Sequence, residues 1–189
     1  MFFLMSKELS LAKAYALTDE DVVNAVKGKA KVVLYEDIKD YDSIDELLKP
    51  YGAVFILYQQ KPSSGHWVPL FKRENNKGNT EVEFFDGYGL APDEELFFTD
   101  KKMRKKLNHD YPYLTELLYN APRGYELIYN EHPFQKYGKG IATCGRHCVL
   151  RLQHRNKSLE DYLRWFKSEM GSGINSEKTD DFVTEMTEK

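Results

Sequence analysis

The chain has 189 residues, of which 41% are hydrophobic and 30% are charged, and its formal net charge is −3 at pH 7. This composition is that of a folded, soluble protein and excludes a disordered chain. The slightly acidic balance gives no overall attraction to nucleic acid or to an anionic membrane. No apolar run reaches the roughly 18 residues of a membrane-spanning helix, so we expect no membrane partner.

The length suits one domain, which we expect over residues 1–170. A Thr18 N-cap with an acidic first turn predicts a helix over 19–26, and the uninterrupted apolar run 53–58 predicts a strand in the interior of a sheet. The segment 171–189 is polar and is expected to be a loose C-terminal tail. Strands are also expected at 32–35, 66–72, 80–86 and 125–129, and helices at 43–48, 93–120, 144–154 and 159–170.

The segments 66–72 and 80–86 flank a turn-rich stretch and so predict a β-hairpin. His66 and Asp86 are each ten residues from Asn76. In an antiparallel pair with its turn centred there, the two side chains would be cross-strand neighbours at the open end of the hairpin. A carboxylate beside an imidazole orients the ring as a general base. The alternative is a surface histidine beside a turn aspartate, because a slip of one residue in the register would turn the pair apart.

Cys144 and Cys148 are the only cysteines of the chain. Cys144 follows a glycine-containing stretch and opens a helical pattern, which places it at or near a helix N-terminus. The N–H groups and the helix dipole at such a position favour a thiolate. The N–H of Cys144 could help to build an oxyanion hole, and Gly145 would let a substrate backbone approach closely. The alternative is that both cysteines are small core residues, and for Cys148 this is the interpretation that we prefer.

A metal site is a further interpretation of the same segment. Cys144, His147 and Cys148 share one helical face, and His66 could complete a set of four ligands. The usual zinc spacings are absent, however, because no second pair of Cys or His residues lies at short separation. A disulfide between two cysteines four residues apart in one helix would be strained. We therefore expect no metal, no cofactor, and free thiols in a reducing compartment.

Four short motifs occur in order between residues 65 and 150. They are Gly65-His66-Trp67, Phe84-Phe85-Asp86-Gly87-Tyr88-Gly89, Gln135, and Thr143-Cys144-Gly145-Arg146-His147-Cys148. In this combination the chain resembles the adenovirus-type maturation cysteine proteases. These enzymes also occur in virophages and virus-like transposons, and they share a clan with the proteases that remove ubiquitin-like modifiers. The resemblance implies an α+β fold with a central mixed β-sheet flanked by helices, and a nucleophilic cysteine at the N-terminus of a buried helix.

The resemblance also implies a role for each motif. Cys144 would be the nucleophile, His66 the general base that takes its proton, and Asp86 the residue that orients His66. Trp67 would pack over the site and shield it from water. Trp67 and Gly145 are the residues expected to contact the substrate.

Gln135 would supply the side-chain donor to the oxyanion, beside the backbone N–H of Cys144. The segment between these two residues is longer than in the cellular relatives of the family, so Asn130 is a fallback donor. His147 is an alternative base because it lies three residues after Cys144. A base on the same helix would, however, approach along the helix rather than from across a cleft.

The substrate expectations come from the same resemblance. Viral members of the family cut capsid and core precursors at small-residue, Gly-containing sites, which implies a viral or virophage endopeptidase acting in virion maturation. A deconjugating isopeptidase for ubiquitin-like proteins is the alternative. A third interpretation is an inactive relative that binds capsid or nucleic acid through the basic run Lys101–Lys106.

Partners and location follow as expectations. The partner would be a polypeptide substrate, with a peptide or DNA as a possible activator of the enzyme. The protein would be found in the virion and in the infected host cell, in a cytoplasmic virus factory or the nucleus, and would not be secreted. The segment Gly171-Ser172-Gly173 suggests self-cleavage in the tail as a further hypothesis.

Overall fold

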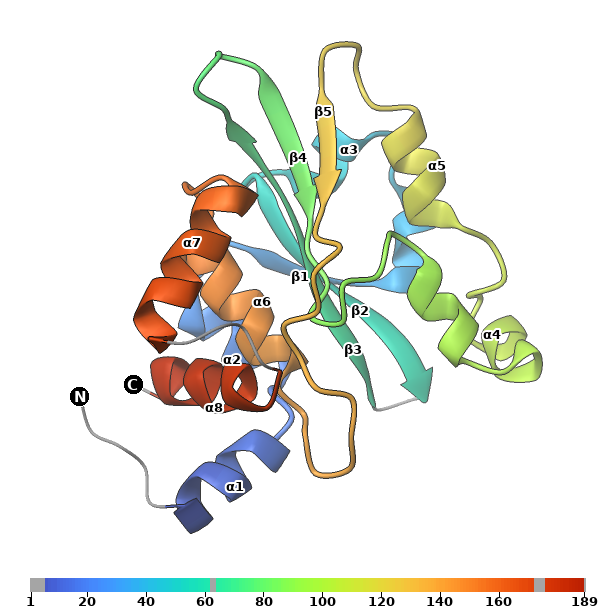
Figure 1. Cartoon of the computed structure of the whole chain (residues 1–189). Coiled ribbons are helices and arrows are strands. Elements are labelled where there is room, and N and C mark those ends of the chain that lie inside the picture. Colours follow the sequence, from blue (N-terminus) through green and yellow to red (C-terminus); the bar gives the residue numbers. More distant parts are fainter. Residues whose placement is uncertain (1–5, 62–63, 172–175, 189) are drawn as a thin grey trace.

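A five-stranded sheet forms the centre of the protein, in a computed structural model that describes residues 6–61, 64–171 and 176–188. The strands lie in the order β1-β2-β3-β4-β5 (Figure 1). Their bounds are β1 Lys31–Leu34, β2 Ala53–Lys61, β3 Ser64–Glu74, β4 Thr80–Phe84 and β5 Glu126–Tyr129. β1 is parallel to β2 and β5 is parallel to β4, whereas β3 is antiparallel to both of its neighbours. The sheet is therefore mixed, as the resemblance implies.

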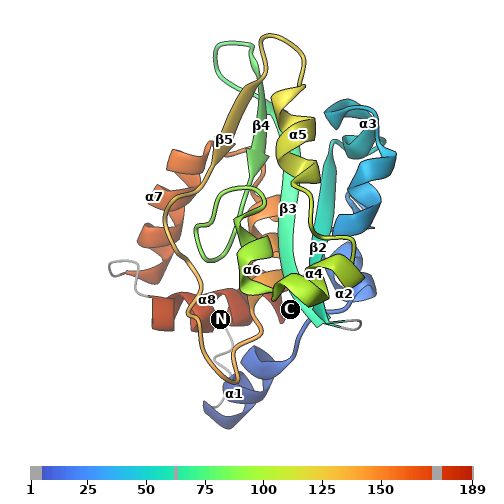
Figure 2. The ribbon, with the colours of Figure 1, turned by 90° about the vertical axis from the view of Figure 1, so that its right-hand side faces the viewer.

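Helices cover both faces of this sheet. The α-helices are α1 Ser6–Ala14, α2 Asp19–Ala25, α3 Ile44–Leu48, α4 Lys101–Lys106, α5 Tyr113–Tyr119, α6 Cys144–Gln153, α7 Leu159–Met170 and α8 Ser176–Thr187, and the 3-10 helices are η1 Tyr35–Asp40 and η2 Glu94–Phe98. Alternate residues of β2 divide the core: Val54 belongs to the cluster that includes Leu114 of α5, and Phe55 points the other way and belongs to the cluster that includes Cys148 of α6. Figure 2 shows α4 and α5 in front of β2 and β3. The α+β fold with helices on both sides of a mixed sheet is confirmed.

Two local predictions about how elements form are confirmed. The Thr18 side chain accepts a hydrogen bond from the N–H of Asp21, and the Asp21 side chain accepts one from the N–H of Thr18, which starts α2 with a capping box. The apolar run 53–58 lies in β2, which pairs with β1 on one side and β3 on the other. Residues 53–56 are all buried, as expected for a strand covered on both faces.

β3 and β4 form the predicted hairpin, but with a different register. Leu70 pairs with Phe84, so the hairpin is centred at residue 77 rather than at Asn76. The position opposite His66 moves from 86 to 88, and the ladder in any case ends at Phe84, so direct cross-strand pairing of His66 and Asp86 is wrong. Because side chains alternate with a period of two, this shift of two positions leaves Asp86 on the same face as His66. Diagonal neighbours on one face remain within reach of each other.

The segment predicted as a loose tail instead contains helix α8, which packs against the body of the protein. α8 lies across the lower ends of α6 and α7 and beside α1 (Figure 1). Val183 is fully buried and Lys13 of α1 forms an ion pair with Asp181 at 2.5 Å. The polar composition of this segment conceals a helix that buries one side, which is why the sequence suggested a tail. Ser172 and Gly173, where self-cleavage is a hypothesis, lie outside the described residues.

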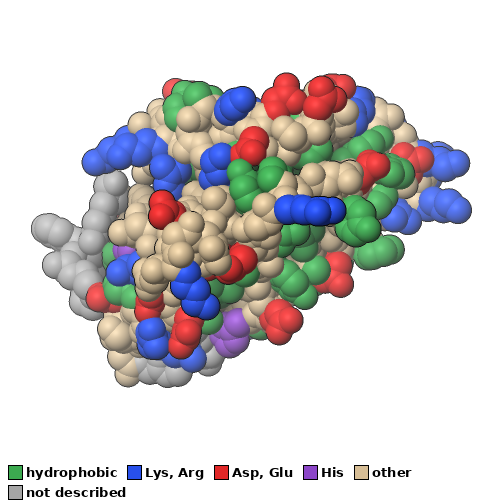
Figure 3. All heavy atoms as spheres, turned by 90° about the horizontal axis from the view of Figure 1, so that it is seen from above, with side chains coloured by type: hydrophobic (Ala, Val, Ile, Leu, Met, Phe, Trp, Pro, Cys, Tyr) green, Lys and Arg blue, Asp and Glu red, His purple; other side chains and the backbone are tan. Residues whose placement is uncertain are grey.

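None of the helices in the described part of the chain is both long and apolar enough to cross a membrane. On the face shown in Figure 3, Lys and Arg side chains are interspersed with Asp and Glu side chains. The described residues on this face therefore present no continuous basic area.

Candidate active site

Cys144 is the first residue of α6, in which every residue from Cys144 to Leu152 is buried. The first N–H groups of a helix have no partner within it, so the N–H of Cys144 remains available at this end. Cys144 lines a cleft of about 730 Å³. The same cleft is lined by His66 from β3 and by Gln135 from the segment before α6. The fold thus brings three of the predicted site residues to one cavity.

Trp67 and Gly145 pack against each other beside the nucleophile. The indole Nε1 of Trp67 donates to the carbonyl of Leu17 at 3.0 Å, and Trp67 also lines the cleft. A Cβ atom at position 145 would lie 3.1 Å from the Cβ of Leu17 and 3.2 Å from the Cδ1 of Trp67. These contacts are tighter than ordinary van der Waals contacts, so a larger residue would push α6 away from β3. Gly145 therefore allows this close packing, and its expected contact with a substrate backbone stays a prediction.

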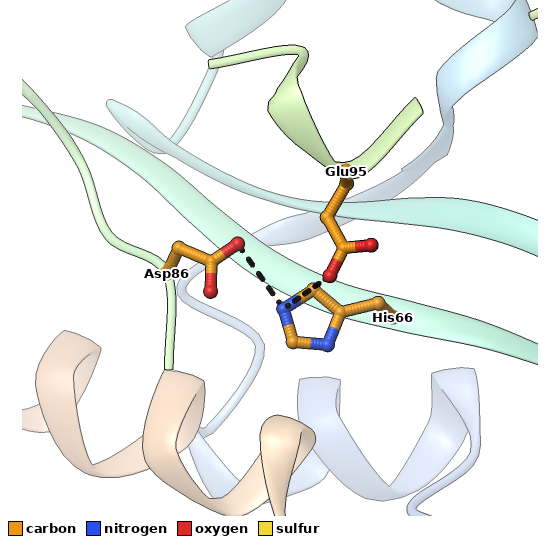
Figure 4. A group of neighbouring side chains, drawn as sticks. All are labelled: His66, Asp86 and Glu95. Atoms are coloured by element: carbon orange, nitrogen blue, oxygen red, sulfur yellow. Dashed lines mark ion pairs between the residues drawn. The ribbon is translucent and has the colours of Figure 1, made fainter. Parts of the chain in front are cut away.

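His66 is 3% exposed and is held through one ring nitrogen. Its Nε2 lies 3.2 Å from Oδ2 of Asp86 and 3.5 Å from Oε1 of Glu95 (Figure 4). Neither Nε2 of His66 nor Oδ2 of Asp86 has a hydrogen-bond partner among the described residues, so the contact between them is an ion pair. The second nitrogen, Nδ1, points away from both carboxylates and is left to interact with Cys144.

The electrostatic surroundings of His66 favour its protonated form. Burial acts to lower the pKa of His66, but the charge of Asp86 and the side-chain contacts with Asp86 and Cys144 raise this pKa well above its usual value. Tyr88 stacks on the imidazole, with 4.7 Å between ring centroids and 20° between the planes. The imidazolium is therefore stabilised by carboxylates at Nε2 and by Cys144 at Nδ1, and an aromatic ring covers it on one side.

Asp86 is itself fixed by two hydrogen-bonding partners. The N–H of Tyr88 donates to Oδ1 of Asp86 at 2.6 Å, so Oδ2 is the oxygen that faces His66. The side chain of Asn130 accepts from the N–H of Asp86 at 2.8 Å and donates to its carbonyl at 2.6 Å. The Asn130 amide also donates to the carbonyl of His132 at 3.1 Å. Because its donors are used in this way, the expectation of Asn130 as a fallback oxyanion donor is wrong.

Gln135 reaches the cleft because its backbone is attached to the loop that carries Asp86. The N–H groups of Phe134 and Gln135 both donate to the carbonyl of Gly87 at 2.8 Å. A Cβ atom at position 87 would lie 2.7 Å from Oε1 of Gln135, so a larger residue there would displace the Gln135 amide from its present position. The Nε2 of Gln135 donates to the Tyr88 hydroxyl at 3.2 Å. An amide nitrogen carries two N–H donors, so one remains for another acceptor in the cleft.

The segment 136–143 is held at both ends by one carboxylate of α8. Asp180 is 1% exposed, and its Oδ2 accepts from the N–H of Lys136 at 2.9 Å while its Oδ1 accepts from the Thr143 hydroxyl. Oδ1 of Asp180 also lies 3.1 Å from Nε2 of His147. Asp180 therefore holds both ends of this segment near the start of α6. His147 is engaged by Asp180 and is not placed as a base for the nucleophile.

Cys148 is a core residue, as predicted. It is fully buried, and its thiol donates to the carbonyl of Trp67 at 3.0 Å. Burial and the charges of Cys144 and Asp86 raise the pKa of the Cys148 thiol well above its usual value. Both cysteines are free thiols. The two thiols therefore differ sharply in their surroundings.

Glu95 and Tyr88 belong to the site although the sequence did not mark them. Among the described residues, His66, Asp86 and Glu95 are the one group of three or more His, Cys, Asp or Glu side chains whose donor atoms all lie within 4.8 Å of one another. A nitrogen and two carboxylates are ligand types that zinc accepts, but the same atoms orient His66. Glu95 lies on the short helix η2, where no local pattern distinguishes it from the exposed Glu94. Tyr88 could have been suspected from its place two residues after Asp86.

Comparison with known proteins agrees with this architecture. No family model matches the chain. The chain is 40% identical over 159 residues to "Uncharacterized protein V9" of the Sputnik virophage. The aligned region covers 84% of this chain and 87% of that protein. Among solved structures, the ASFV pS273R protease matches with a TM-score of 0.52 and 13% identity, over 95% of this chain and 73% of its own. A de-sumoylating protease matches with a TM-score of 0.44 and 12% identity, over 98% of this chain and 80% of its own.

Proposed function

Since the chain belongs to the family of the Sputnik virophage protein V9 and has the fold of the ASFV pS273R protease, we propose that it is a cysteine endopeptidase that processes virion precursor proteins. The observation that carries this proposal is the row Cys144, His66, Asp86. A thiol at a helix N-terminus is linked to a buried imidazole, and a buried carboxylate holds the other nitrogen of that imidazole. In thiol proteases a base contacts the nucleophile, and an orienting group contacts the base.

In the proposed reaction, His66 takes the thiol proton and the thiolate of Cys144 attacks the carbonyl carbon of the scissile peptide bond. The C–N bond then breaks as His66 returns the proton to the leaving amine, and an acyl group remains on the sulfur as a thioester. A water molecule that gives a proton to His66 attacks this thioester and releases the carboxylic acid product. The proton returns to the sulfur, and the enzyme is regenerated.

The negative charge that develops on the carbonyl oxygen of the substrate needs hydrogen-bond donors beside it. The N–H of Cys144 is one, and the remaining N–H of the Gln135 amide is the other. Tyr88 would hold the Gln135 amide in place through its hydroxyl while its ring covers His66. Such preorganised donors act strongly because the groups are buried and need not reorient during the reaction.

The proposed substrates are precursor proteins of the virion. We place cleavage at small, Gly-containing sites in capsid or other virion precursors, and the virophage source of the relative supports a virion setting. Activity would then be found in the virion and in the infected host cell. A deconjugating isopeptidase for ubiquitin-like proteins remains the second candidate. A peptide or DNA activator is a further proposal, for which the basic helix α4 is the local candidate surface.

The proposal is tested with four proteins: the wild-type chain, Cys144→Ala, His66→Ala, and Cys148→Ala as a control that removes the other thiol. Each is incubated with a capsid precursor and with a ubiquitin-like protein fusion, and the products are mapped by mass spectrometry. Cleavage of the precursor by the wild type and Cys148→Ala alone is the expected result. Cleavage of the fusion alone would favour the isopeptidase.

An inactive relative would give a different pattern. No Cys144-dependent product would form from either substrate, and salt-dependent binding to duplex DNA would point to a binding module. Labelling with iodoacetamide near pH 6 separates these cases without any substrate. Modification of Cys144 that is faster than that of Cys148 and is lost in His66→Ala would support an activated thiolate.

A further inference from the structure

Two buried carboxylates face the same nitrogen of His66. Oδ2 of Asp86 is 3.2 Å and Oε1 of Glu95 is 3.5 Å from Nε2, and the two side chains are 0% and 3% exposed. Asp86 comes from the loop after β4 and Glu95 from η2, so they approach Nε2 from different directions (Figure 4). One Nε2–H cannot donate well to both carboxylates. One imidazolium also cannot balance two buried negative charges.

Among the described residues, His66 is the one cation that acts on the pKa of Glu95. The ionisable groups that act on Glu95 are His66 from β3 and Asp86, and β2 contributes only the neutral Gln60, whose side chain hydrogen-bonds to Glu95. Tyr88 and Cys144 interact with His66 at other parts of the ring. Oε2 of Glu95 is buried without a hydrogen-bond partner among the described residues. A buried carboxylate in such a place tends to keep its proton.

We propose that Glu95 is a second positioning residue for His66. While Glu95 is protonated, Asp86 alone orients the ring, and once Glu95 is ionised it stabilises the imidazolium further. This inference deepens the proposed protease function and rests on it. Burial raises the pKa of Glu95, the charge of His66 opposes this effect, and the charge of Asp86 adds to it. Glu95 therefore gains its charge at a higher pH than an ordinary glutamate. At that point it extends the pH range over which His66 stays protonated.

The same geometry makes the two carboxylates partly interchangeable. When Asp86 is replaced by Asn, Glu95 still faces Nε2 and can hold the ring. The effect of removing the Glu95 charge should therefore be larger in the Asp86→Asn background than in the wild type, which is a coupling that independent residues would not show.

The experiment measures iodoacetamide labelling of Cys144 and kcat/KM on a cleaved peptide, both as a function of pH. The variants are Glu95→Gln, Glu95→Asp, Asp86→Asn and the double variant Asp86→Asn/Glu95→Gln. Glu94→Gln is the matched control, because Glu94 is the exposed neighbour whose carboxylate accepts from the N–H of Ala91. Thermal unfolding of every variant shows whether the fold is kept.

We expect Glu95→Gln to move the alkaline limb of both profiles to lower pH by about one unit, with KM little changed. Glu95→Asp should show a smaller shift than Glu95→Gln, and Glu94→Gln should show none. An unchanged alkaline limb in Glu95→Gln, in both backgrounds, would overturn the inference, as would a loss of thermal stability alone. A limb that moves when EDTA is added to the wild type would also overturn it, because a metal ion would then balance the charge. Absence of Cys144-dependent activity in the wild type would instead refute the proposed function.

Discussion

Replacing Asp180 by Asn should loosen the wall of the cleft without removing any residue that lines it. The Asp180 carboxylate accepts from the N–H of Lys136 and from the Thr143 hydroxyl, and it pairs with His147, while 1% exposed. A hydrogen bond to a charged group contributes about 1.5–3 kcal/mol, roughly twice a neutral one. Asn keeps the shape, but it is neutral and has only one accepting oxygen. A loss of about 1 kcal/mol at each of three contacts lowers the free energy of unfolding by about 3 kcal/mol.

The effect of Asp180→Asn on catalysis should exceed its effect on substrate binding. A displacement of a catalytic group by about 1 Å can cost about 100-fold in rate, so we expect kcat/KM to fall by about 10- to 100-fold. Urea unfolding and peptide cleavage measure the two effects. Asp181→Asn is the matched control, because Asp181 is 42% exposed and pairs with Lys13, and its substitution should cost less than about 1 kcal/mol. If Asp180→Asn and Asp181→Asn behave alike in both assays, the idea that α8 holds this segment is refuted.

Three further predictions concern single groups of the cleft. Gln135→Ala should lower kcat by about 100- to 1,000-fold with KM nearly unchanged, and a change confined to KM would contradict its role as an oxyanion donor. Tyr88→Phe keeps the ring over His66 but removes the acceptor for the Gln135 amide, so kcat should fall only about 2- to 10-fold, and a larger fall would mean that the hydroxyl does more than position. Because the pKa of His66 is raised in the folded state, its pairing should stabilise the fold fully below the ordinary histidine pKa of about 6.5 and lose this effect as the pH rises through the raised value. The difference in unfolding free energy between the wild type and His66→Gln, measured in urea across this range, should shrink toward alkaline pH, and a constant difference would contradict the assignment.

Local patterns in the sequence determined much of the fold and part of the site. The apolar run of β2 predicts a strand that is buried on both faces, and the capping residues of α2 predict where this helix begins. The break between a glycine-containing stretch and the helical pattern places Cys144 at the start of α6. The hairpin pattern also predicted that His66 and Asp86 lie close together. The predicted register was off by two residues, but side chains alternate between the two faces of a strand, so both residues stay on the same face.

Contacts between distant segments decided the rest. Asp180 lies 44 residues from Lys136, and Asn130 lies 44 residues from Asp86, and no local pattern announces either pair. Glu95 reaches His66 because η2 packs against β2, the neighbour of β3, and α8 is partly buried because it packs against α6 and α1. The sequence by itself determined most of the strands and helices, although not α8, because hydrophobic periodicity and capping are short-range signals. The tertiary structure alone decided which carboxylates and amides surround Cys144 and His66, because that depends on how separate elements pack and which buried polar groups they must satisfy.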